Sequence, residues 1–183
     1  SIRHGHPSTM HLWWARRPLA SSRAVLMALL LPDSCDPNCP NEFKEQAREI
    51  LLGMHGRPRG WTKEIKGDEG LQRIMLKFIA DFSNWDNSAD PACLEAARGL
   101  VQAAHPEETP LVADPFSGGG SIPLEGLRLG CDSFATDLNP VALLILKIML
   151  EDIPRHGPGL AEELRKVGGE IKAAAEKELA DLY

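Results

Sequence analysis

A glycine-rich turn between two short apolar runs constrains the fold of this chain more than any other feature. The apolar run 111–113 leads into DPFSGGGS at 114–121, and a helical pattern follows at 122–129. A second apolar run, 133–136, ends in Asp137. Strand, glycine turn, helix, strand and acid in this order form half of a nucleotide-binding fold. The acid lies about 20 residues after the first glycine, which is the position that binds ribose hydroxyls.

The turn departs from the fingerprint of dinucleotide-binding proteins. G-x-G-x-x-G needs a third glycine, and Pro123 stands there after Gly118 and Gly120. Pyrophosphate favours a helix N-terminus without nearby negative charge, whereas Asp114 immediately precedes the turn. A carboxylate there suits a ligand with positive charge, and S-adenosylmethionine carries an ammonium and a sulfonium. The turn therefore favours S-adenosylmethionine over NAD, and the simplest alternative is a helix N-cap at Ser121.

Longer stretches of the chain resemble a known family. D-P-F-x-G-x-G-S looks like the cofactor motif of amino-methylating DNA methyltransferases. The opening SIRHGHPSTMHLWWARRPLA (1–20) and GGGSIPLEGLRLGCDSFATDLNPVALLILK (118–147) are similar to a family of adenine-specific DNA methylases. In that family an N-terminal domain of unknown function precedes a zinc ribbon and a catalytic motif. The likeness is weak at 168–183 and slight at 40–105; it implies S-adenosylmethionine as methyl donor and transfer to N6 of a flipped adenine.

Two parts of the family pattern have no counterpart. The family's catalytic tetrapeptide is an Asp, Asn or Ser followed by Pro-Pro and an aromatic, and no two prolines are adjacent here. The zinc ribbon is also missing. We therefore expect the cofactor-binding fragment of a longer methyltransferase, inactive by itself, whether the chain is naturally short or cut from a longer one. The alternatives are a non-catalytic subunit that binds the cofactor or DNA, and a methyltransferase acting on RNA or protein.

The cofactor candidates cluster around the turn. Asp114 is expected to hold the cofactor's amino group, directly or through water, and Asp137 to accept both ribose hydroxyls. Gly118 and Gly120 let the backbone approach the ligand. The further candidates for contact with the cofactor are Phe116 alongside it, Leu138 at the adenine, Asn139 as ligand contact or helix N-cap, and Ser8 or Thr9 at the carboxylate.

Basic residues give a weaker case for nucleic acid. The chain has a net charge of -6, yet residues 1–32 contain arginines and no acid, and a basic segment of this kind can contact phosphate locally. Arg16 and Arg17 could pair with the cofactor carboxylate or with DNA phosphate. Arg57, Arg59 and Trp61 have the composition of a nucleic-acid loop, although a solvated loop explains them as simply. DNA is the expected partner, through the full-length protein.

Composition limits the remaining classes. With 183 residues and 43% hydrophobic content the chain can bury a core. No window reaches the roughly 18 apolar residues of a membrane helix, so we expect no membrane partner and a cytoplasmic location. Cys35 and Cys39 are the only close pair among four cysteines, and a zinc site needs four ligands, so we expect no metal.

The expected fold is α/β: a partial Rossmann-like methyltransferase fold with few parallel strands and a helical N-terminal region. The expected divisions are a helical region at 1–105, a cofactor-binding unit at 106–156 and a C-terminal helix at 157–183. The helices expected from periodicity and end signals are 18–31, 41–52 (capped by Asn41), 70–82, 91–104 (capped by Asp90), 140–150 (apolar almost all round, hence buried) and a last helix interrupted at 168–169. Two strands leave open sheet edges, which favours a homo-oligomer or a missing C-terminal half.

Overall fold

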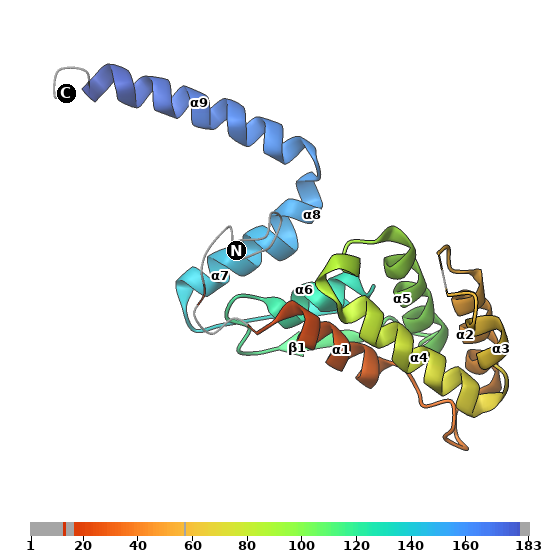
Figure 1. Ribbon diagram of the computed structural model, residues 1–183. Helices are drawn as coiled ribbons and strands as arrows, with labels where there is room; N and C mark the ends of the chain where they lie inside the picture. Colours follow the sequence, from red (N-terminus) through yellow and green to blue (C-terminus); the bar gives the residue numbers. More distant parts are fainter. Residues whose placement is uncertain (1–12, 14–16, 57, 180–183) are drawn as a thin grey trace.

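The structure, a computed structural model, describes residue 13 and residues 17–56 and 58–179, and most of them are helical (Figure 1). Its elements are α1 (Leu19–Leu30), α2 (Asn41–Gly53), α3 (Trp61–Glu64), α4 (Gly67–Ser83), the short 3-10 helix η2 (Trp85–Asn87), α5 (Pro91–Ala104), β1 (Leu111–Asp114), α6 (Ser121–Arg128), β2 (Asp132–Ala135), α7 (Pro140–Leu146), the π-helix η3 (Lys147–Asp152), α8 (Ile153–His156) and α9 (Gly159–Leu179). In a coarse sense this is the expected α/β arrangement: helices around a two-stranded parallel sheet.

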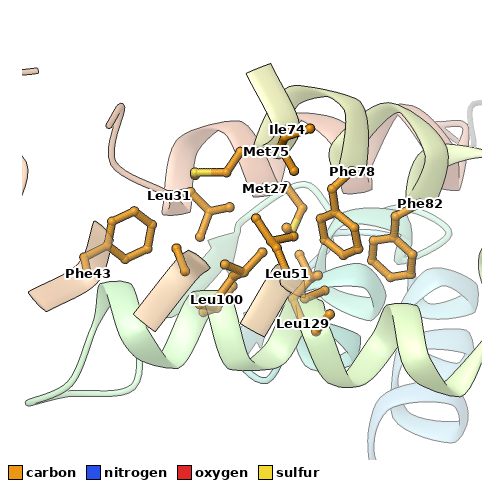
Figure 2. Close-up of a cluster of buried hydrophobic side chains, with 14 of the residues drawn as sticks. Met27, Leu31, Phe43, Leu51, Ile74, Met75, Phe78, Phe82, Leu100 and Leu129 are labelled. Atoms are coloured by element: carbon orange, nitrogen blue, oxygen red, sulfur yellow. The ribbon is translucent and has the colours of Figure 1, made fainter. Parts of the chain in front are cut away.

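The main core lies among α1, α2, α4 and α5. Helix α4 illustrates how this core forms, because the apolar residues of α4 recur at helical spacing and produce one continuous stripe. Figure 2 shows these side chains meeting partners from the other helices and Leu129 just after α6. The rings of Phe78 and Phe82 stack with centroids 5.8 Å apart. The most deeply buried members of this core include Met27, Phe43, Leu51, Leu71, Ile74, Phe78, Phe82, Leu100 and Leu129.

Two of the three expected N-caps are confirmed. The Asp90 carboxylate accepts the N–H of Cys93 at 2.8 Å and Pro91 opens α5. The Asn139 amide oxygen accepts the N–H of Val141 at 2.9 Å at the start of α7. The prediction for Asn41 is wrong: Asn41 is already helical, Pro40 occupies the N-cap position, and no side chain caps this end.

The sheet pairs β1 and β2 in parallel, from Leu111 opposite Asp132 to Asp114 opposite Ala135. Helix α6 makes the crossover, as the strand–turn–helix–strand pattern predicts. Gly126 lets α6 approach the sheet, because a Cβ there would lie 2.9 Å from the Ser133 hydroxyl and 3.2 Å from Val112. A glycine inside a short amphipathic helix is a usable sequence signal of such close packing.

The expectation that 140–150 is buried all round is wrong. Ala142, Ile145, Leu146 and Met149 are buried, whereas Leu144 remains 59% exposed. Helix α6 packs against one side of the segment. The two-stranded sheet does not extend over the opposite side, so no described element covers that side. The segment also changes from α to π geometry at Lys147.

The expected interruption of the last helix at 168–169 is also wrong. Helix α9 runs unbroken through both glycines, although each costs about 1 kcal/mol relative to alanine. It extends away from the body of the molecule (Figure 1), and none of its residues is buried. Its apolar residues Leu164, Val167 and Ile171 are exposed on one stripe. Within the described part of the chain, no helix combines the length and apolar character needed to span a membrane.

Candidate functional site

A pocket of about 220 Å³ lies beside the glycine turn, where β1 and β2 end. Parallel sheets bind ligands at this carboxyl edge. Four of the predicted cofactor residues line it together: Asp114, Phe116, Gly118 and Asp137. The N-terminal segment adds Trp13 and Arg17, and α6 contributes Ser121 and Ile122.

The turn requires glycine at two positions. Gly118 has a φ of +50° and Gly120 a φ of +74°, a region that side-chain-bearing residues rarely adopt. Space is also restricted: a Cβ on Gly118 would lie 2.8 Å from the Trp13 indole nitrogen, and one on Gly120 would lie 2.5 Å from the Met149 methyl group. Gly120 therefore packs against η3, whereas Gly118 lines the pocket.

Asp137 organises the turn through both carboxylate oxygens. Oδ2 accepts the N–H of Gly118 at 2.8 Å and Oδ1 accepts the N–H of Asn139 at 2.8 Å. These donations, with that of Asn139 the larger cause, lower the pKa of Asp137, so the side chain is ionised at neutral pH. Each oxygen has a second lone pair, so the carboxylate can still accept hydrogen bonds from a diol.

Asp114 also has a local role in the structure of the turn. Its Oδ1 accepts the N–H of Phe116 at 3.1 Å, which closes a tight turn after β1. The side chain is half-buried and lines the pocket. Phe116 itself is 80% exposed, so it is a surface ring at the pocket and not part of the core.

Three other predicted residues lie beside the turn, without lining this pocket. Asn139 uses its side chain to cap α7, and Gly120 packs against Met149 and Leu146. Leu138 is 94% exposed on the surface. Ser8, Thr9 and Arg16 lie outside the described residues.

The N-terminal segment is attached to the turn at two points. The Trp13 side chain is buried beside Ala142 and Ile145 and faces Gly118. The Ser121 hydroxyl donates a hydrogen bond of 2.8 Å to the carbonyl of Arg17. Ser121 is therefore not the N-cap of α6, which was the simplest alternative for it; Gly120 occupies that position.

The loop expected to contact nucleic acid is only partly a loop. Arg59 is exposed, and Arg57 lies outside the described residues. Trp61 opens the short helix α3 and is 3% exposed within the main core. Its ring is thus not available to stack on a base, and burial of an aromatic side chain explains its presence better.

A buried ion pair joins α1 to α6, and the sequence did not predict it. Arg23 of α1 donates to Glu125 of α6 from Nε at 2.7 Å and from Nη2 at 3.0 Å, and both side chains are fully buried. The Arg23 Nη1 donates to the Phe82 carbonyl at 2.6 Å, and Arg128 donates to Glu125 at 2.9 Å. An arginine inside an apolar helix was the only local signal of this pair.

The cysteines do not form an obvious reactive centre. All four are free. Burial, followed by the hydrogen bond and charge of Asp90, raises the pKa of the Cys93 thiol to about 11, so the thiol stays protonated at neutral pH. Among the described residues, no three or more His, Cys, Asp or Glu side chains are grouped so as to hold a metal ion.

Comparison with known proteins gives a family match at the N-terminal end. Residues 1–54 match the model of a family described as a protein of unknown function, DUF1156. The matched region contains Trp13, Arg17 and Arg23, which reach the turn or its helix. Searches of curated proteins and of solved structures found no significant match.

Proposed function

We propose that this chain is the cofactor-binding part of an S-adenosylmethionine-dependent DNA methyltransferase that modifies adenine at N6. The observation that carries the proposal is the convergence of Asp114, Asp137 and the glycine turn on one pocket at the carboxyl edge of a parallel sheet. The fold assumed by the proposal is a Rossmann-like methyltransferase sheet, of which β1, α6 and β2 are one unit.

The charge of the pocket favours this cofactor over a dinucleotide. Two carboxylates line it, and a pyrophosphate placed at the start of α6 would be repelled by both. A sulfonium and an ammonium would be attracted by the same groups. The two remaining acceptor positions on Asp137 suit the two ribose hydroxyls.

The size of the pocket suggests which end of the cofactor it holds. Its volume of about 220 Å³ is below the roughly 300–1,000 Å³ of typical ligand pockets. We therefore assign the ribose and the methionine end to the pocket and the adenine to the surface beside the exposed ring of Phe116 and the exposed Leu138.

DNA and adenine enter the proposal through the resemblance of 1–20 and 118–147 to adenine-specific DNA methylases. The match of 1–54 to a family of unknown function covers the N-terminal part of that resemblance and names no activity. The base-holding tetrapeptide would be supplied outside this chain. A subunit that binds the cofactor or DNA without catalysis, and a methyltransferase acting on RNA or protein, remain the alternatives.

Replacing Asp137 with alanine is expected to weaken binding of S-adenosylhomocysteine by about 10- to 100-fold, since hydrogen bonds to a charged group contribute about 1.5–3 kcal/mol. Isothermal titration calorimetry measures the change. Asp132→Ala is the matched control, because Asp132 is an exposed aspartate at the opposite end of β2. Equal binding by the wild type and by Asp137→Ala removes Asp137 from the site, and failure of the wild type to bind rejects the proposed function.

The 183-residue chain alone is expected to transfer no methyl group. Transfer needs groups that hold the amino nitrogen in line with the methyl carbon, and the tetrapeptide with that role has no counterpart in this sequence. The assay is incorporation of labelled methyl groups into DNA rich in adenine, with labelled cofactor in excess. Incorporation above a protein-free control would show that the chain is a complete enzyme.

A further inference from the structure

Arg17 introduces a positive charge into a pocket whose other charged groups are carboxylates. Of the described residues lining the pocket, Asp114 and Asp137 are acidic and Arg17 is basic. The side chain of Arg17 is exposed, so its guanidinium is accessible to a ligand without loss of a buried contact. A pocket of this composition matches a ligand that carries charges of both signs.

The backbone at Arg17 is held in place from both sides. Its carbonyl accepts the Ser121 hydroxyl, which fixes it to the first turn of α6. Four residues earlier, the Trp13 ring lies against Gly118. Six residues later, Arg23 is paired with Glu125 inside the protein. A side chain that starts from a fixed backbone loses less freedom on binding, so Arg17 is well placed to select a ligand group.

We propose that Arg17 binds the α-carboxylate of the cofactor's amino-acid end and thereby makes the pocket select nucleosides with an amino-acid tail over nucleosides without one. The inference rests on the proposed function and specifies its recognition. The guanidinium presents paired N–H donors that match the two oxygens of a carboxylate. Asp114 would then take the ammonium of the same tail, so that both charges of the zwitterion meet an opposite charge.

A pair of ligands tests this directly. S-adenosylhomocysteine carries the amino-acid tail, and 5′-methylthioadenosine has the same nucleoside and sulfur without it. Calorimetry would compare both ligands on the wild type, on Arg17→Met and on Arg17→Lys. Arg59→Met is the matched control, because Arg59 is an exposed arginine in the loop before α3.

Arg17→Met is expected to weaken the binding of S-adenosylhomocysteine by about 10- to 100-fold. The affinity for 5′-methylthioadenosine should stay within about two-fold of that of the wild type. Arg17→Lys should be intermediate, because lysine keeps the charge and loses the paired donors. Arg59→Met should change neither affinity.

Four results would overturn the assignment. An equal loss for both ligands would show a structural role for Arg17. Unchanged binding of both ligands, with weaker binding of a DNA duplex by Arg17→Met, would assign the side chain to phosphate. If neither ligand binds to the wild type, both the proposed function and this inference are rejected. If the wild type binds both ligands and the Arg17 substitutions do not change the difference between their affinities, the inference alone is rejected.

Discussion

Glu125→Gln is expected to lower the free energy of unfolding by about 3–5 kcal/mol, a large effect for a single substitution. Arg23 and Glu125 are both fully buried, and the amide cannot neutralise the guanidinium. The Arg23 side chain would keep its hydrogen bond to the Phe82 carbonyl and its ring contact with Phe82, yet its charge would stay in the core without a partner. Urea unfolding followed by circular dichroism measures the change.

Two controls separate the charge effect from packing. Glu162→Gln in α9 removes the acid of another ion pair, with Arg165, but that pair is exposed and should contribute no measurable stability. The double substitution Arg23→Met with Glu125→Leu should recover most of the loss, because apolar residues of similar size often replace a buried pair at little cost. A loss below about 1 kcal/mol for Glu125→Gln would mean that water reaches the pair.

Gly70→Ala is expected to destabilise the protein by about 2–3 kcal/mol, even though alanine favours helices by about 1 kcal/mol over glycine. A Cβ on Gly70 would overlap the backbone carbonyl oxygen of Glu64 and lie 3.0 Å from the carbonyl carbon of Ile65. Backbone atoms cannot rotate away as a side chain can. The first turn of α4 would therefore move from α3 and pull the buried Trp61 and Ile65 out of contact with the core.

Other helical glycines provide the comparison. A Cβ on Gly99 of α5 would meet Ile50 at 3.4 Å, an ordinary contact, and one on Gly168 of α9 would meet nothing within 4 Å. Both alanine variants should raise the free energy of unfolding by up to about 1 kcal/mol. If Gly70→Ala unfolds at the same urea concentration as Gly99→Ala, α3 and α4 can separate enough to admit a methyl group without loss of core packing.

Local chemistry explains which parts of the fold were predictable. Asp90 and Asn139 each precede a proline and a helical pattern, and a cap depends on a few neighbouring atoms that lie together in sequence. The parallel pairing of β1 and β2 followed from the glycine turn between them for the same reason. Asp114, Phe116, Gly118 and Asp137 meet at one pocket because all four lie at the ends of the two parallel strands or in the turn that follows β1.

Long-range contacts explain the rest. Arg23 and Glu125 are separated by 102 positions, and nothing near either residue identifies its partner. Trp61 lies between basic residues in a stretch with turn-like composition, and only the packed structure shows that its ring belongs to the core. At 168–169, the intrinsic weakness of glycine is outweighed by the alanine, glutamate and lysine residues around it, so α9 continues.

The buried Arg23–Glu125 pair also links the segment covered by the family match to a distant part of the chain. The family match ends at residue 54, but Arg23 within it is neutralised by a carboxylate that lies well outside it. Residues 1–54 expressed alone would leave that guanidinium without its counter-charge, and the remainder alone would leave Glu125 with Arg128 as its one described ion-pair partner. The segment covered by the family match therefore lacks, by itself, the carboxylate that pairs with its own buried arginine. Moving it between proteins would require moving the helix after the glycine turn with it.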